Sequence, residues 1–484
     1  MKRISLIKSM SLLNRTFMIL ALGLASLTSV AKDRLVVSKA PAGIELKNDF
    51  KVQARTSGGE WQDIDTYAFK VDRVADAKHN VEVTSVAKFE FEGKVEIQVK
   101  SIAQDIKSFK VRPNSYGIEA KQEGNTLTFS LDRPRYLSVE INGNIYQNLQ
   151  IVADNILEKP KVKKKKDLMY FGPGVHDFKG DSIHIASGKT VFIDNGAVIK
   201  GWLSTYGSRD VKILGHGIVM PGHHEGIMVR YSKNVYIDGP LTTQLPIGGS
   251  DSVTVKNAKV MSWYGWGDGF NIFASNNIYQ EHLFARTSDD CSTIYCTRKN
   301  YHGGCKNITI KDFVMWADVA HPIMIGLHSE TPENEDIINV LYDNIDILEH
   351  AENQIDYQGC IGINNGDNIL VKGVTFQNFR IDNIRKGMLF NMRVCFNKKY
   401  CSAPGRGIED ITLRNIAYTG EAPNMGIIAG YDENRKVKNI RFENFTINGK
   451  VISDDMPGKP KWYKTADLAN IYVNDHVDNI TFSK

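Results

Sequence analysis

Cysteine is scarce in this chain, with only six among 484 residues. A hydrophobic content of 42% supplies a large core, so no disulfide framework is needed to hold the fold. The cysteine spacings match no zinc-binding pattern, and the sequence predicts no metal site and no cofactor. Cys395 and Cys401 are near enough in sequence to pair, as are Cys296 and Cys305, but the pairing stays open.

The chain also lacks a hydrophobic run long enough for a comfortable transmembrane helix. The apolar stretch Phe17–Leu27 follows four basic residues and precedes the small-x-small pattern of Ser29–Ala31. This order is typical of a secretory signal peptide, so we expect residues 1–31 to be removed; a retained anchor is the alternative. We predict a periplasmic or secreted protein with no membrane span after that removal.

The chain also has almost no excess of positive over negative charge. The formal net charge of +5 includes the four basic residues of the N-terminal segment, so the mature chain carries about +1. A nucleic-acid partner requires a strong basic surplus and is therefore excluded.

What the chain does contain is period-two alternation. Residues 32–157 hold short segments such as "KFEFEGKVEIQVKSI" and "YLSVEING", with an Asn-Gly hairpin signal at 142–143. They predict a small antiparallel β-sandwich. The lysine-rich segment 158–167, "EKPKVKKKKD", breaks this pattern and is expected to be a solvated linker, with a patch for an anionic surface as the alternative.

From residue 168 to 484 the same short phrase recurs, as in "SKNVYIDG", "CKNITIKDFVM" and "GDNILVKGVTF". Each phrase has a polar pair, an apolar-x-apolar step and a turn residue, and the repeats are often 23 to 32 residues apart. Such a period predicts a solenoid, and the β-branched, Asn-rich composition narrows it to a right-handed parallel β-helix. An extended groove along such a cylinder suits an extended polymer.

In this repeat, Asp268 lies one coil before the adjacent pair Asp289 and Asp290. Asp268 precedes Asp289 and Asp290 by 21 or 22 residues, and neighbouring strands lie about 4.8 Å apart. Two charges about 5 Å apart repel by roughly 3 kcal/mol at an effective dielectric of about 20, so at least one carboxyl should stay protonated near neutral pH. A protonated acid beside ionised carboxylates suits glycosidic bond hydrolysis. For both residues of the pair to serve one site, the backbone there must bend or bulge.

The phrases "GDGFNIF", "SDDCSTIY" and "VMWADVAHPIMIGLHS" together resemble the core of the β-helical glycoside hydrolases of families 28 and 49. These are polygalacturonases, and dextranases with isopullulanases; the match is closer to family 49, whose members also carry an N-terminal β-sandwich. The resemblance implies that Asp289 is the general acid and that Asp268 and Asp290 activate water, with inversion at the anomeric carbon. His321 falls near the histidine that follows the aspartate pair in polygalacturonases.

The resemblance also bears on the substrate, which we expect to be an α-linked polysaccharide or oligosaccharide. Polygalacturonases bind the uronate carboxylate through an Arg-x-Lys pair, which "NQIDYQGCIGINNGDN" at 353–368 lacks. A neutral α-glycan is therefore favoured, unless Arg393 reaches the groove from a later coil.

Further substrate-binding candidates are aromatic and polar side chains near the aspartates. Trp266 and Trp316 are candidate sugar platforms, with burial in the core as the alternative. His328, Tyr357 and Arg393 are placed by their expected position on the coils, and His321 by the resemblance.

Two other functions stay open. A β-helical polysaccharide lyase would use the aspartates to hold calcium, with an Arg or Lys as base. A non-catalytic carbohydrate-binding β-helix would bind glycan without cleaving it. We expect a monomer in each case.

Overall fold

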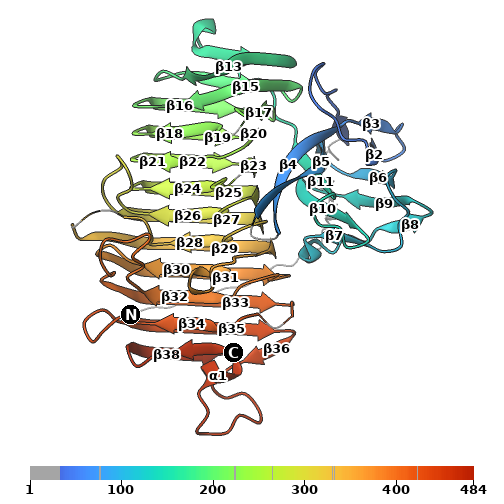
Figure 1. The fold of residues 1–484 in the computed structure, drawn as a ribbon. Helices are drawn as coiled ribbons and strands as arrows, with labels where there is room; N and C mark the ends of the chain where they lie inside the picture. The colour runs from blue at the N-terminus through green and yellow to red at the C-terminus, as the bar shows by residue number, and fades with distance from the viewer. Residues whose placement is uncertain are drawn as a thin grey trace, which may run out of the picture. The chain divides into compact units, whose positions relative to one another are not determined.

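A computed structural model describes residues 33–484 apart from 76–77, 223–224, 264, 330, 332 and 422. The predicted signal peptide lies outside the described residues. No helix in the described part of the chain has the length and apolarity needed to cross a membrane. Two β structures follow one another along the chain (Figure 1).

The first is a sandwich of two sheets with its own apolar core. Neighbouring strands are antiparallel, as predicted, except that β5 and β11 run parallel. The six-stranded sheet contains β1 (Arg34–Val36), β4 (Thr66–Ala75), β5 (Lys78–Glu92), β7 (Phe109–Arg112), β10 (Arg135–Ile141) and β11 (Leu149–Asn155). The five-stranded sheet contains β2 (Phe50–Thr56), β3 (Gln62–Ile64), β6 (Val95–Ser101), β8 (Lys121–Glu123) and β9 (Thr126–Leu131).

The second is a 27-stranded stack in which each coil pairs in parallel with the next. One series of strands is β12 (Leu168–Phe171), β14 (Thr190–Ile193), β16 (Arg209–Leu214), β19 (Lys233–Asp238), β22 (Asp251–Lys256), β25 (Asn276–Thr287), β27 (Cys305–Ala317), β29 (Glu335–Glu349), β31 (Ile369–Ile381), β33 (Gly407–Tyr418), β35 (Val437–Ile447) and β38 (Val477–Ser483).

The other strands face these across the cylinder or turn its corners. They are β13 (Gly174–His184), β15 (Ala197–Ser204), β17 (Ile218–Val219), β18 (Ile227–Arg230), β20 (Leu241–Thr242), β21 (Ile247–Gly248), β23 (Lys259–Met261), β24 (Phe270–Phe273), β26 (Ser292–Tyr295), β28 (Ile323–Ile325), β30 (Ile361–Asn365), β32 (Phe390–Val394), β34 (Gly426–Ala429), β36 (Lys450–Ile452) and β37 (Ile471–Val473). The helices are α1 (Thr465–Leu468) and the 3-10 turns η1 (Asn114–Tyr116), η2 (Lys165–Asp167) and η3 (Ile355–Tyr357).

The repeated phrases of the sequence explain why the coils stack. Their apolar residues point inward and form one continuous core along the cylinder. Their turn asparagines adopt positive φ, as Asn277 and Asn307 do, because Asn tolerates the left-handed region. These asparagines also bond from coil to coil: Asn307 Nδ2 donates to Asn277 Oδ1 at 3.0 Å, and Asn339 Nδ2 donates to Asn307 Oδ1 at 2.9 Å.

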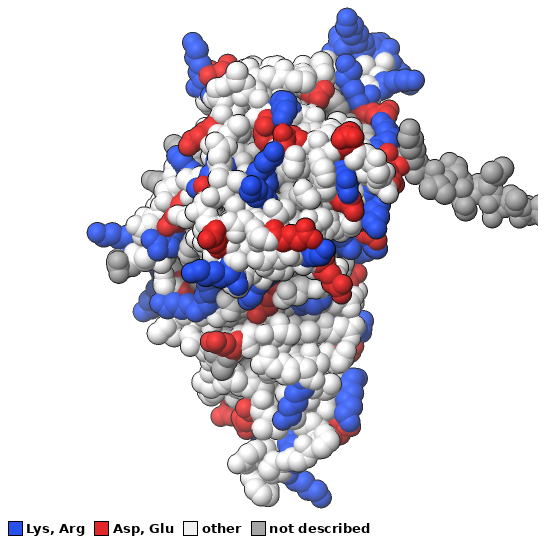
Figure 2. Space-filling view, turned by 90° about the vertical axis from the view of Figure 1, so that its right-hand side faces the viewer, with Lys and Arg blue, Asp and Glu red and all other residues white. Residues whose placement is uncertain are grey.

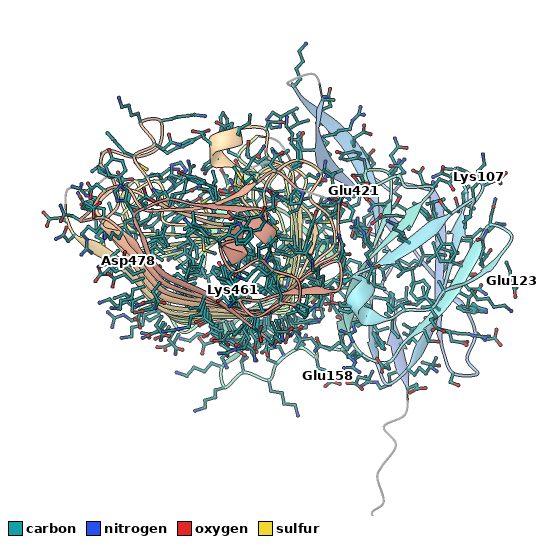
Figure 3. All side chains as sticks on the ribbon, turned by 90° about the horizontal axis from the view of Figure 1, so that it is seen from below. Lys107, Glu123, Glu158, Glu421, Lys461 and Asp478 are labelled. Carbon is teal, nitrogen blue, oxygen red and sulfur yellow. The ribbon has the colours of Figure 1, made fainter. Side chains whose placement is uncertain are left out.

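A long hairpin, β4–β5, connects the sandwich to the flank of the cylinder (Figure 1). Tyr67, Phe69 and Val71 of β4 share an apolar cluster with Met261 and Phe284 of the coils. Figure 3 looks along the superposed coils, with the sandwich, marked by Lys107 and Glu123, to one side. On the face shown in Figure 2, positive and negative side chains are interspersed over most of the surface, as the small net charge predicts.

Candidate active site

The parallel register places Asp268 and Asp290 on adjacent coils. Phe270 of β24 pairs with Ser292 of β26, so the residues two positions earlier face one another, and Gly269 N donates to Asp290 O at 2.8 Å. Glycine is required beside Asp268 because an added Cβ at Gly269 would lie 2.3 Å from the carbonyl oxygen of Cys291. The next coil continues the row, since Ser292 pairs with Ile323 and His321 therefore follows Asp290.

Asp289 and Asp290 lie at a corner between β25 and β26, where the chain bends out of the ladder. This bend lets two successive side chains reach one site, as the sequence required. Thr287 Oγ1 donates to Asp289 O at 2.6 Å, and Asp289 Oδ1 accepts from Asp290 N at 3.1 Å. Carboxylate oxygens of Asp268, Asp289 and Asp290 all lie within 4.8 Å of one another. The structure thus brings the three aspartates together, as their spacing predicted.

Asp290 is held ionised by a buried histidine. His321 Nδ1 lies 2.6 Å from Asp290 Oδ1, while His321 Nε2 bonds to Tyr357 O. Because a carbonyl oxygen only accepts, Nε2 carries a proton; with Nδ1 donating to the carboxylate, the ring is an imidazolium. Burial alone would raise the pKa of Asp290, but the charge and hydrogen bonds of His321 outweigh burial and hold that pKa below its usual value.

The pKa values of the other two carboxyls are shifted in the opposite direction, upward. Burial, and then the charge of Asp290, raises the pKa of Asp268 from 3.8 to about 7, although Asn271 and Arg298 lower it. Burial and the neighbouring charges of Asp268 and Asp290 raise the pKa of Asp289 well above its usual value. The cluster therefore combines one carboxylate with a carboxyl that keeps its proton at neutral pH.

The aspartates open into a cleft of about 1760 Å³, larger than the roughly 300–1,000 Å³ typical of small-molecule pockets. Its volume suits several sugar units. Trp266 lies at its rim with 80% of its surface exposed, as a platform residue would. The predicted residues His328 and Tyr357 also line the cleft, and both rings contact Tyr400, with centroids 4.7 Å and 5.1 Å away.

The buried position of Trp316 contradicts the prediction that this residue is a sugar platform. Its side chain is completely buried, and the guanidinium groups of Arg112 and Arg286 lie 4.8 Å and 4.4 Å from its ring centroid. Its Nε1 donates to Asp318 at 2.9 Å. The Trp faces the sandwich rather than the cleft, so the alternative of core burial holds.

His321 and Arg393 also differ from their prediction as substrate contacts. His321 is fully buried and does not line the cleft, so it acts on Asp290 rather than on a sugar. The guanidinium of Arg393 donates to Asn391 Oδ1 at 2.9 Å and to Asp356 O, and it too is absent from the cleft lining. Arg393 therefore does not supply the missing uronate-binding cation.

Several residues that line the cleft were not predicted from the sequence. Arg298 lines the cleft 5.5 Å from the Tyr295 ring, and it has no ion-pair partner among the described residues. Tyr206 and Tyr231, on earlier coils, contact each other edge to face at 5.5 Å and line the far part of the cleft. The repeat period signals which coil they occupy, but only the corner geometry reveals which way they point.

A bound cation fits this cluster poorly. Three carboxylates could offer one oxygen each, but calcium takes six to eight oxygens. Both oxygens of Asp290 already accept hydrogen bonds, Oδ1 from His321 and Oδ2 from Tyr295 at 3.1 Å. The imidazolium beside Asp290 also opposes a second positive charge there. This donor set suits proton transfer better than metal binding.

Comparison with known proteins agrees with this fold. The protein is a right-handed parallel β-helix preceded by a small antiparallel β-sandwich, the architecture of Dex49A from Penicillium minioluteum, with which it shares a TM-score of 0.64 and 13% identity over 92% of this chain and 96% of that chain. Residues 242–456, which include the three aspartates, match the family model of glycosyl hydrolases family 28. The resemblance to the clan of families 28 and 49 is thus confirmed.

A family 28 exopolygalacturonase from Yersinia enterocolitica is a further structural match, with a TM-score of 0.48 and 11% identity over 80% of this chain and 96% of that chain. No curated protein matches the sequence.

Proposed function

We propose that this protein is an exported glycoside hydrolase that cleaves an α-linked polysaccharide or oligosaccharide. The observation that carries the proposal is the geometry of the cluster: carboxylate oxygens of Asp268, Asp289 and Asp290 lie within 4.8 Å of one another, and His321 lies 2.6 Å from Asp290. The pKa shifts that follow from this arrangement, downward for Asp290 and upward for the other two, support it. The family 28 match over the same coils supports it. Export rests on the signal-like pattern of residues 1–31.

In the proposed reaction Asp289 gives its proton to the departing glycosidic oxygen, Asp290 accepts a proton from the attacking water, and Asp268 helps to orient that water. His321 has a positioning role, because its imidazolium keeps Asp290 ionised. Asn271 holds Asp268 through a 2.8 Å hydrogen bond from Nδ2 to Oδ2. The half-buried cluster limits competing bulk water, which strengthens these charge interactions.

Inversion of the anomeric carbon is proposed from the resemblance. Carboxyl separations of about 6.5–9.5 Å are usual for inverting enzymes and about 5–5.5 Å for retaining ones, whereas the carboxylate oxygens here lie within 4.8 Å of one another. The anomer formed first, followed by proton NMR during early hydrolysis, decides between the two outcomes.

Both neutral and acidic glycans belong in the substrate test. The missing Arg-x-Lys pair favours a neutral glycan, but Arg298 offers the cleft a guanidinium with no ion-pair partner among the described residues. Arginine binds a sugar carboxylate with two parallel hydrogen bonds. We would therefore incubate the protein with dextran, pullulan, polygalacturonate and mannan, and read the products by chromatography.

Asp289→Asn tests the mechanism. Asparagine keeps the shape of the side chain but cannot donate the acid proton, so we expect kcat/KM on the cleaved glycan to fall about 10²–10⁴-fold. Asp251→Asn, on β22 and away from the cleft lining, is the matched control and should leave the rate unchanged. Full activity of Asp289→Asn would overturn the assignment. Glycan binding without hydrolysis by the wild type would instead favour a carbohydrate-binding protein.

Product absorbance separates hydrolysis from elimination. A lyase would form an unsaturated sugar that absorbs in the ultraviolet, and its activity would stop with a chelator. The hydrogen-bonded state of Asp290 favours the hydrolase, so we expect no such absorbance and no effect of chelator.

A further inference from the structure

One face of the β4–β5 hairpin lines the cleft, although the hairpin belongs to the sandwich. Asp72 of β4 pairs with Val81 of β5, and Val74 pairs with His79. All four residues border the same cleft as Asp268, Asp289 and Asp290. Because strand residues alternate between faces, these two cross-strand pairs lie on one face of the hairpin, and that face borders the cleft.

Two residues of this face form a hydrogen-bonded pair. His79 Nδ1 lies 2.6 Å from Asp72 Oδ2. The Asp72 side chain is 3% exposed, whereas that of His79 is 51% exposed. The second oxygen of Asp72, Oδ1, is buried and has no hydrogen-bond partner among the described residues. A buried carboxylate that orients an exposed imidazole leaves the other ring nitrogen of His79 available to a ligand.

The hairpin is fixed against the coil that carries the catalytic loop. Lys70 of β4 lies over the Trp263 ring, 4.1 Å from its centroid. Val71 packs in the cluster that contains Met261. His79 Nε2 is 3.9 Å from the position of a Cβ built at Gly265, next to the platform residue Trp266. His79 is thereby held beside the loop that leads into Asp268.

We propose that this hairpin face is a sugar-binding subsite in which His79, oriented by Asp72, hydrogen-bonds a hydroxyl of the glycan. With Nδ1–H donating to Asp72, Nε2 of His79 accepts a hydrogen bond from a sugar hydroxyl. Val74 and Val81 supply an apolar surface for the C–H face of the same ring. The proposal rests on the proposed function only in taking the ligand to be a glycan; it makes the sandwich part of the substrate site.

Binding can be measured without hydrolysis in the Asp289→Asn background. We would measure the retardation of the full chain in native gels that contain dextran, pullulan or polygalacturonate. Adding His79→Ala should weaken binding to the retarding polysaccharide about tenfold, the effect of one lost hydrogen bond. His79→Gln, which keeps a polar group at similar reach, should restore part of it. Lys78→Ala, one residue away and not part of the cleft lining, is the control and should bind normally.

A double-mutant cycle distinguishes a positioned ligand from a structural role. If Asp72 acts through His79, Asp72→Ala should add little to the loss of binding that His79→Ala causes. In the protein that keeps Asp289, each substitution should raise KM while kcat stays nearly constant. Melting temperatures of the four proteins check that the hairpin remains folded. Unchanged retardation and KM in His79→Ala, or no retardation of Asp289→Asn by any of the three polysaccharides, would overturn the subsite.

The two proposals fail separately. Hydrolysis by the wild type with normal binding by His79→Ala would refute the subsite and leave the hydrolase. Retardation that depends on His79, without hydrolysis of any glycan by the wild type, would support the subsite and refute the hydrolase.

Discussion

Asp289 and Asp290 are neighbours in sequence, yet their environments shift their pKa values in opposite directions. Asp290 accepts hydrogen bonds from His321 and Tyr295, which stabilise its charge. Asp289 instead meets burial and the charges of other carboxylates, which stabilise its protonated form. A difference in partners, rather than in residue type, thus separates the pKa values of the two carboxyls.

The raised pKa of Asp268 predicts a pH-dependent gain in stability for Asp268→Asn. The folded state keeps the Asp268 proton up to about pH 7, whereas the unfolded state loses it near 3.8. The wild type is therefore destabilised progressively as pH rises between these values, and the penalty is complete above pH 7. We expect the variant to melt at nearly the wild-type temperature at pH 4 and a few degrees higher at pH 8.

Scanning fluorimetry across this pH range measures the difference. Asp455→Asn is the control, because Asp455 is exposed and pairs with Lys484 at 3.1 Å; it should gain nothing at any pH. A melting difference for Asp268→Asn that stays constant between pH 4 and pH 8 would contradict the assigned proton.

At this scale the sequence predicts proximity better than orientation. The spacing of Asp268 from the aspartate pair equals one coil, so a repeat period was sufficient to bring them together. The prediction that Trp316 is a sugar platform was wrong for the same reason. The repeat period indicates which coil carries a residue, but it does not indicate which other elements cover that residue. His321 occupied the right place, but its partner atoms, and hence its role, depend on the corner geometry.

The coil corners form a row of aromatic rings that extends the cleft away from the aspartates. Tyr231 contacts Tyr206 at 5.5 Å and Tyr301 at 5.3 Å, and all three line the cleft. Aromatic rings present a large, rigid surface with a polar tip, which suits sugar faces. Stacking of coils thus converts single tyrosines into an extended platform.

Tyr231→Ala should weaken the processing of long substrates. Removing the middle ring takes away contact surface far from the scissile bond, so we expect KM for polymers to rise about three- to tenfold with little change for short oligosaccharides. Tyr231→Phe keeps the ring and should stay near the wild type. Tyr472→Ala, an exposed tyrosine away from the cleft, is the control. Steady-state kinetics on a series of chain lengths measures the effect, and equal losses at every length would contradict it.

The repeated phrases predicted the parallel coils because alternation and turn asparagines are local signals. The parallel pairing of β5 with β11 was not predictable in this way. It joins segments that are far apart in the chain, and no local pattern encodes such a partner.

At the scale of the whole molecule, a buried arginine joins the coils to the sandwich. Arg286 of β25 is fully buried and donates to Asp318 at 2.8 Å and 3.1 Å, and to Asn148 Oδ1 and Ile145 O of the sandwich, both at 2.8 Å. Its guanidinium also stacks on Trp316. Charges so far from water persist only because every partner is provided.

Arg286→Ala should therefore be strongly destabilising. It leaves the Asp318 carboxylate buried without its main partner, which costs about 3–5 kcal/mol in the free energy of unfolding. Arg414→Ala removes an exposed arginine that pairs with Glu443 at 2.6 Å, and should cost less than about 1 kcal/mol. Denaturant unfolding of both variants tests the contrast. Equal stabilities would show that the junction carries little energy.

This junction could not be read from the sequence. No local pattern around an arginine in a strand identifies a distant partner, and Arg286 and Asn148, which meet here, are 138 residues apart. Composition and alternation gave two β regions, but their contact surface arises only when both are folded.

Val74, Ala75 and Val81 border the cleft but belong neither to the apolar core of the coils nor to the cluster that the hairpin shares with them. Sequence changes at Val74, Ala75 or Val81 would therefore reshape one wall without disturbing the strands that align the aspartates. In the proposed enzyme, the residues that select the substrate can therefore change independently of those that carry out the reaction. A library of variants restricted to these three positions offers a direct route to enzymes that accept different glycans at an unaltered reaction centre.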